Sequence, residues 1–137
     1  MARDKYHEIV RIALEAEGWI ITNDPFEVST LIADLEIDLA AERLIAAEKG
    51  KELIAVEVKS FLGKSLLHDF YKAVGQFSFY NLILFEDDPD RTLYLALPEA
   101  AFRYLFKDPI IAKLARINGM KFILFDIETK KITLWKK

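Results

Sequence analysis

The sequence predicts a single mixed α/β domain, a β-sheet with helices packed against it. The 137 residues are within the usual size of one domain, and 53% of them are hydrophobic, which is enough to fill one core. Apolar segments alternate between helical and strand spacing along the chain. Residues 92–97 are almost continuously apolar, as in a strand that is covered on both faces of its sheet. We therefore treat residues 1–137 as one domain.

The first part of the chain predicts a helix followed by extended segments. An apolar stripe at helical spacing ends at Gly18, a residue that commonly terminates helices. A short strand follows and is expected to close at an Asn-Asp-Pro turn. The expected segments are a helix at 4–17, a strand at 19–22, a loop at 26–33 and an extended segment at 35–39.

A β-hairpin is expected next. Two apolar runs, residues 44–48 and 52–59, are joined by Lys49-Gly50-Lys51. Residues 40–47 also contain good helix formers, so a helix is the alternative there. The tight turn between two apolar runs favours the strand.

A long helix should follow the hairpin, with Ser65 as its N-cap. Its expected buried side consists of Leu67, Phe70, Tyr71, Val74, Phe77 and Ser78. A second stripe at four-residue spacing contains His68, Lys72, Gln76 and Tyr80. The later segments are the long helix at 66–84, an acidic turn at 86–90, a strand at 92–97, helices at 98–106 and 109–118, and strands at 121–125 and 131–135.

The composition narrows the classes of function. The chain has no cysteine and two histidines, which excludes a disulfide framework and a thiolate zinc site and disfavours a multi-histidine metal site. It has no apolar run near the roughly 18 residues of a membrane span and no signal-peptide core, so we expect a cytoplasmic protein that does not enter a membrane.

Charge is unevenly distributed along the chain. The net charge is −3, but residues 103–137 carry nine Lys/Arg against three Asp/Glu. Such a basic segment is an ordinary solvated surface or, alternatively, a face that meets phosphate or an acidic partner.

Two charged residues end the second strand of the hairpin. Because side chains on a strand point alternately to two faces, Glu57 and Lys59 share a face with Leu53 and Ala55, and the residues between them point the other way. Another acid, Asp38, interrupts an apolar run upstream. Charged groups in apolar surroundings are costly to bury without partners. These three are therefore expected either to pair structurally or to bind a ligand.

The residue types fit metal-assisted phosphodiester hydrolysis. Two carboxylates on adjacent strands repel each other unless a cation lies between them, and oxygen ligands suit Mg²⁺ or Mn²⁺. A bound metal lowers the pKa of its water and stabilises charge at phosphorus. A neighbouring lysine can orient the water or stabilise the phosphate. An inert, buried salt-bridge cluster is the alternative interpretation.

These residues resemble the PD-(D/E)xK nuclease superfamily. Asp38 matches its isolated acid, and Glu57 with Lys59 matches its second motif. Gln76 and Tyr80 on the following helix resemble the Gln-xxx-Tyr extension of some branches. The resemblance implies a restriction-endonuclease-like fold, a mixed β-sheet flanked by α-helices, and a Mg²⁺- or Mn²⁺-dependent endodeoxyribonuclease site.

The same resemblance assigns the remaining site residues. The Val58 backbone carbonyl would complete the metal ligation by Asp38 and Glu57, Lys59 would position the water, and Gln76 would support the site. Some branches place a further acid on the first helix, where Glu8 is the candidate. The sequence departs from the superfamily at Ile37, where the superfamily has proline. The candidate DNA contacts are Lys64, Lys72 and Tyr80.

The resemblance narrows to the XisH family, cyanobacterial proteins named as fdxN-element excision controlling factors. It implies a role in the programmed removal of a DNA element during heterocyst development, alongside a site-specific recombinase and an XisI-like protein. The segments that carry it are Tyr6-His7-Glu8, residues 18–25, Ile37-Asp38-Leu39, residues 44–50, residues 54–63, Gly75-Gln76-Phe77, residues 90–96 and Trp135.

Two functions from different classes remain open at this stage. The first is a DNA-excision factor with a working nuclease site, which would bind DNA and could pair as a homo-oligomer to cut two strands. The second is a catalytically silent module that binds DNA or protein on a nuclease fold. Outside the site, we expect His7 to be a surface or capping residue and Trp19 and Trp135 to be core or interface aromatics.

Overall fold

The computed structural model describes residues 6–26 and 44–137. The predicted extended segment at 35–39, with Asp38, and most of the predicted loop at 26–33 lie outside these residues. The helices are α1 (His7–Ala16), α3 (Leu66–Asp87), α4 (Glu99–Leu105) and α5 (Pro109–Ile117). The strands are β1 (Ile20–Phe26), β2 (Leu44–Lys49), β3 (Glu52–Val58), β4 (Arg91–Pro98), β5 (Phe122–Asp126) and β6 (Lys131–Lys136).

The six strands form one mixed sheet in the order β1-β2-β3-β4-β5-β6. β3, β4 and β5 are parallel neighbours in the middle of the sheet, and the pairs β1–β2, β2–β3 and β5–β6 are antiparallel. The parallel step from β3 to β4 needs a long crossover, which α3 supplies. The predicted mixed α/β fold is confirmed, and the arrangement agrees with a nuclease-like α/β domain.

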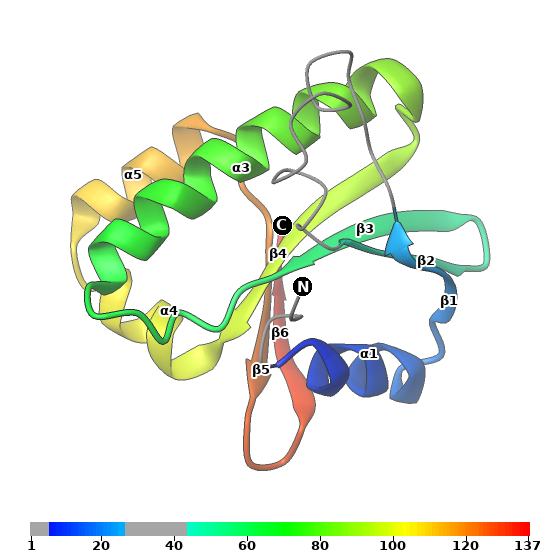
Figure 1. Cartoon of the computed structure of the whole chain (residues 1–137), viewed down its shortest axis with the longest axis horizontal. Helices are drawn as coiled ribbons and strands as arrows, with labels where there is room; N and C mark the ends of the chain where they lie inside the picture. Colours follow the sequence, from blue (N-terminus) through cyan, green and yellow to red (C-terminus); the bar gives the residue numbers. More distant parts are fainter. Residues whose placement is uncertain (1–5, 27–43) are drawn as a thin grey trace.

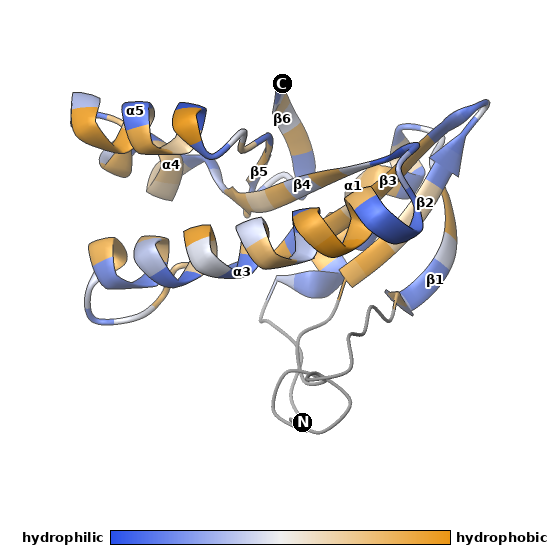
Figure 2. Cartoon of the chain, turned by 90° about the horizontal axis from the view of Figure 1, so that it is seen from above, coloured by the Kyte–Doolittle hydropathy of each residue, from blue (hydrophilic) through white to orange (hydrophobic). Residues whose placement is uncertain are grey.

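Helices cover the two faces of the sheet unequally. α1 lies on one face, and the longer α3 lies with α4 and α5 on the other (Figure 1). Val10 and Leu14 of α1 pack in one hydrophobic cluster with Val56 of β3, whereas Phe70 and Phe77 of α3 pack in a second cluster on the other face. Hydrophobic and hydrophilic stretches alternate along α3 (Figure 2). The two faces of β3 therefore pack in two different hydrophobic clusters.

The local signals at helix ends and turns explain why the elements begin and end where they do. The Ser65 side chain accepts a hydrogen bond from the backbone N–H of His68, so the predicted N-cap of α3 is confirmed. Gly50 has a φ of +60° in the turn between β2 and β3, a conformation that favours glycine. Asp108 caps α5 by accepting a hydrogen bond from the N–H of Ile110 at 3.0 Å.

Two local predictions are wrong. β1 does not close at residue 22 but continues to Phe26, which pairs with Leu44 of β2. The buried side of α3 was predicted only in part: Phe70 and Phe77 are buried as expected, but Leu67 and Tyr71 are 43% and 57% exposed. Tyr80, which was assigned to the polar stripe, is 4% exposed. In both places, tertiary packing overrides a signal that is local in the sequence.

The described part of the chain, residues 6–26 and 44–137, contains no helix that is both long enough and apolar enough to cross a membrane.

Candidate functional site

The candidate site is built at the carboxyl end of β3. Glu57 is the last but one residue of this strand and is 1% exposed, while Lys59 follows the strand and is partly exposed. The Lys59 Nζ lies 3.7 Å from Glu57 Oε2. The backbone N–H of Lys59 donates to the carbonyl of Ala96 on β4, which continues the parallel pairing past the end of β3 and fixes the position of the lysine.

The predicted division of β3 into two faces is confirmed. Ile54, Val56 and Val58 belong to the hydrophobic cluster beneath α1, whereas Ala55 belongs to the cluster beneath α3. Strand alternation places Glu57 with Ala55, on the α3 face. The carboxylate is therefore held in the layer between the sheet and the long helix.

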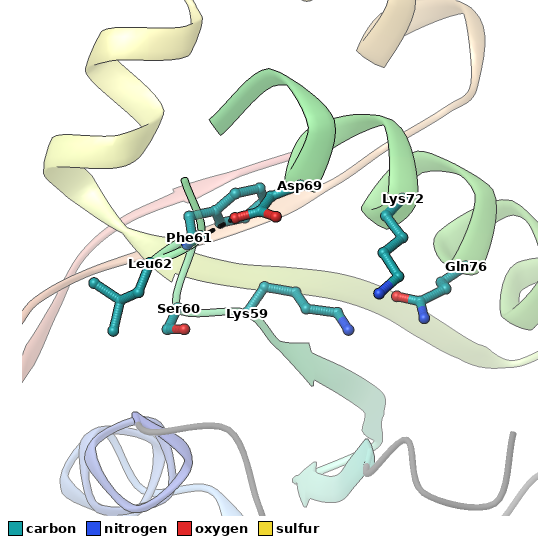
Figure 3. A pocket seen from close by; sticks show the side chains of 8 residues that line it. Lys59, Ser60, Phe61, Leu62, Asp69, Lys72 and Gln76 are labelled. Atoms are coloured by element: carbon teal, nitrogen blue, oxygen red, sulfur yellow. Dashed lines mark hydrogen bonds between the residues drawn. The ribbon is translucent and has the colours of Figure 1, made fainter. Parts of the chain in front are cut away.

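A pocket of about 220 Å³ is lined by Lys59, the residue whose ammonium group lies 3.7 Å from the Glu57 carboxylate. It is lined by Lys59 and the loop after it on one side and by α3 on the other. Figure 3 shows the Lys59 side chain extending toward Lys72 and Gln76, which project from successive turns of α3. Two ammonium groups and a side-chain amide in one hollow form a pocket suited to an anion.

The loop between β3 and α3 forms one wall of this pocket and is tied to the helix. Asp69, in the first turns of α3, accepts a hydrogen bond from the Gly63 N–H at 3.0 Å. A Cβ at Gly63 would lie 2.5 Å from an Asp69 carboxylate oxygen, so only glycine permits this approach. Phe61 anchors the same loop in the core with a φ of +54°, an uncommon backbone conformation for a bulky residue. Sequence reasoning missed Asp69 as a loop contact, because neither residue alone signals it.

The described residues supply some, but not all, of the oxygen ligands that were predicted for a divalent cation. No group of three His, Cys, Asp or Glu side chains that could hold a metal occurs in residues 6–26 and 44–137. The carboxylate of Glu57 and the carbonyl of Val58 are oxygen donors of the kind that Mg²⁺ accepts together with water. The second predicted carboxylate, Asp38, lies outside the described residues.

Only some of the remaining predicted residues lie at this pocket. Gln76 and Lys72 line the pocket, as described above, but Tyr80 is packed in the hydrophobic core beneath α3. Lys64 lines a different, neighbouring pocket. Glu8 is exposed on α1, the helix that covers the opposite face of the sheet.

A second buried polar cluster was not predicted. His7 is 2% exposed, so the expectation of a surface or capping residue is wrong. Its Nε2 lies 2.8 Å from Asp24 Oδ1, and Arg11 donates to Asp24 Oδ2 at 2.7 Å. We call His7, Arg11 and Asp24 the α1–β1 clamp. The spacing of His7 and Arg11, four residues apart on one helix face, was a signal for it.

Comparison with known proteins identifies the relatives of this fold. The chain matches the XisH protein family over residues 1–133. This chain belongs to the XisH family. An XisH family protein from Nostoc punctiforme PCC 73102 is 38% identical, with a TM-score of 0.85 over 98% of this chain and 100% of that one.

A second crystal structure is similar to this chain in both sequence and fold. An fdxN element excision controlling factor protein from Anabaena variabilis is 36% identical, with a TM-score of 0.84 over 96% of this chain and 98% of that one. No curated protein matches the chain. The resemblance to XisH proteins, fdxN element excision controlling factors, is therefore confirmed over nearly the whole length.

Proposed function

We propose that this XisH protein acts in the excision of a DNA element through a metal-dependent nuclease site at the carboxyl end of β3. The observation that carries the proposal is the buried Glu57 carboxylate beside the partly exposed Lys59, at a pocket that also receives Lys72. Burial of a carboxylate is costly, and a buried carboxylate paired with a lysine that lines a pocket is typical of a functional site.

Each residue of the site has a distinct proposed role. Glu57 and the Val58 carbonyl, with Asp38, would hold Mg²⁺ or Mn²⁺, which when bound supplies an activated water and stabilises charge at phosphorus. Lys59 would orient the attacking water and stabilise the phosphate as its negative charge grows.

The wall of α3 provides the remaining contacts. Lys72 would hold the non-bridging oxygens of the phosphodiester, and the Gln76 amide would hydrogen-bond within the same hollow.

In excision, the proposed partners are DNA, a site-specific recombinase and an XisI-like protein. The role of Tyr80 in this scheme is to pack the helix in place rather than to contact DNA.

A nicking assay tests the proposal. Supercoiled plasmid is incubated with purified protein and Mg²⁺ or Mn²⁺, and the rate of nicking is compared for the wild type, Lys59→Ala and Asp38→Ala. Both variants should lose cleavage by at least about a hundredfold, the usual scale for removing a group that stabilises transition-state charge. Lys113→Ala, an exposed lysine on α5, is the matched control and should cleave like the wild type.

A silent regulatory module on the same fold is the competing function. It is favoured if the wild type does not cut with either metal and if titration with Mg²⁺ or Mn²⁺ shows no binding that depends on Asp38 and Glu57. Cleavage that persists unchanged in Lys59→Ala would also contradict the nuclease proposal, because it would have to come from another site or a contaminant.

A further inference from the structure

A second pocket lies between the beginning of α3 and the α4–α5 turn. Its volume is about 700 Å³, within the range of pockets that hold small molecules or single nucleotides. Its floor is apolar and includes Leu66 and Ile111, and its rim carries Lys64, Tyr104 and Lys107. None of the roles proposed above uses Tyr104 or Lys107.

This pocket adjoins the candidate nuclease site along a single stretch of chain. Residues 59–63 line the first pocket, and the residues that follow, from Lys64 to Leu67, line the second. The two pockets are therefore lined by consecutive residues of the chain, at the start of α3.

The charges along the rim favour an anion. Lys64 and Lys107 both line the pocket, and Asp108 is the only acid among its lining residues. The Asp108 carboxylate already accepts the N–H of Ile110 as the cap of α5. These residues lie where the basic segment from residue 103 onward meets the α3 loop.

The aromatic residue at this rim is exposed to solvent. Tyr104 is 62% exposed on α4, and the Lys107 Nζ lies 6.0 Å from its ring centroid. An exposed ring adjacent to lysines is the combination with which proteins hold unpaired nucleotides, because the ring stacks on a base while the ammonium groups bind the flanking phosphates.

We infer that the second pocket binds an unpaired stretch of the DNA strand that runs through the candidate site. Lys64 and Lys107 hold its phosphates, and Tyr104 stacks on a base above the apolar floor. The inference rests on the proposed function, because it takes the ligand of the first pocket to be DNA. It adds a binding subsite and a preference for single-stranded or locally opened DNA.

The test measures binding without cleavage. Fluorescence anisotropy of a labelled single-stranded oligonucleotide is recorded in EDTA, where metal-dependent cutting cannot occur, for the wild type, Tyr104→Ala, Lys64→Ala and Lys107→Ala. Tyr104→Ala should weaken binding by about 5- to 160-fold, which corresponds to the roughly 1 to 3 kcal/mol that one stacked base is worth. Each lysine variant should lower the slope of log affinity against log salt by about 0.7, since one phosphate contact to a single strand is lost.

Two controls keep the result specific to the pocket. Tyr104→Phe retains the ring and should bind within about twofold of the wild type, and Lys113→Ala should leave the salt slope unchanged although it removes the same charge from α5. All the substituted side chains are on the surface or the pocket rim, so thermal unfolding midpoints should agree among the variants.

The outcomes separate this inference from the nuclease proposal. Binding that depends on Tyr104 in a protein that never cleaves supports the subsite and contradicts the nuclease site. If the protein cleaves DNA but its binding of the oligonucleotide does not change in the Tyr104, Lys64 and Lys107 variants, the nuclease proposal is supported and the subsite is contradicted. If polyglutamate instead binds in a manner that depends on Lys64 and Lys107 while the oligonucleotide does not, the pocket takes an acidic protein and the inference is wrong.

Discussion

The two buried polar clusters of this molecule differ in geometry, and the difference distinguishes a structural cluster from a site. In the α1–β1 clamp, Asp24 lies 2.8 Å from His7 and 2.7 Å from Arg11, both at hydrogen-bond distance. At the end of β3, the Glu57 and Lys59 side chains are 3.7 Å apart and lie beside an open hollow. Ion pairs at hydrogen-bond distance within the fold compensate the cost of burial, whereas a lysine that also lines a pocket can meet a ligand.

Removing the shared acid of the clamp should have the largest effect on stability. Asp24→Ala leaves a buried imidazole and a guanidinium without their carboxylate, and removal of one partner from a buried ionic cluster costs about 3 to 5 kcal/mol. The free energy of unfolding is measured by urea denaturation. Asp90→Ala, an exposed acid in the turn before β4, is the control and should change stability by less than about 0.5 kcal/mol. A loss below about 1 kcal/mol in Asp24→Ala would mean that the clamp is not structural.

A smaller effect is expected where the loop meets α3. Gly63→Ala places a Cβ where the Asp69 carboxylate now lies, so the carboxylate must turn away and its hydrogen bond from the Gly63 N–H is lost. The loss of one such bond should lower the free energy of unfolding by about 1 kcal/mol. The rate of DNA cleavage should fall even under conditions in which the variant is fully folded, because this loop forms a wall of the pocket at the candidate site.

A glycine on α3 supplies the matched control for this loop variant. Gly75→Ala has open space around its new Cβ and removes a flexible residue from a helix interior. It should therefore raise the free energy of unfolding by about 0.5 to 1 kcal/mol. Equal effects of the two alanines on cleavage would contradict a role for the loop in shaping the pocket.

Substitution of the site carboxylate should change stability less than removal of Asp24. Glu57→Gln keeps the shape of the side chain, and the Lys59 ammonium that loses its charged partner is partly exposed to water, whereas Asp24→Ala leaves a buried imidazole, so the free energy of unfolding should fall by less than in Asp24→Ala. Any rise in the melting temperature that Mg²⁺ or Mn²⁺ causes in the wild type should disappear in the variant. If Glu57→Gln lowers the free energy of unfolding as much as Asp24→Ala does, Glu57 stabilises the fold in the same way as the α1–β1 clamp.

The sequence predicted the two faces of β3 correctly but not the extent of β1, for a physical reason. The positions of Glu57 and Lys59 follow from strand alternation, which depends only on spacing, and the structure places Ala55 and Val56 on opposite faces as expected. The signal for β1 was misleading, because Asn-Asp-Pro usually ends a strand whereas here Asp24 is engaged by α1.

Contacts between distant residues could not be predicted from local patterns. Tyr80 was assigned to the polar stripe of α3, but the direction in which a helix buries its side chains is set by the sheet beneath it. The contact between Asp69 and Gly63 likewise exists only after the loop folds back on the helix. The order of apolar segments predicted a mixed sheet with helices packed against it, and the resemblance to PD-(D/E)xK nucleases added the restriction-endonuclease-like arrangement.

Tyr94 reports whether water is excluded from the hydrophobic cluster beneath α1. Of the changes in the free energy of unfolding predicted here, the one from Tyr94→Phe near neutral pH should be the smallest. Tyr94 is buried in the cluster beneath α1 and packs edge-on against Trp135 at 5.1 Å. Burial, and to a lesser extent the charge of Glu52, raises the pKa of its phenol. The folded state thus favours the neutral form.

The sign of the pH dependence follows from this shift. Below the ordinary tyrosine pKa of about 10, the phenol is neutral in both states, so the stabilising contribution is fully present, and it is lost as the pH rises through the higher pKa of the folded state. Urea denaturation at increasing alkaline pH should therefore show a decline that Tyr94→Phe reduces. Tyr71→Phe, which alters a tyrosine that is 57% exposed, should leave the decline unchanged. If the two variants behave alike, burial does not set the ionisation of Tyr94, and water reaches its phenol in the folded protein.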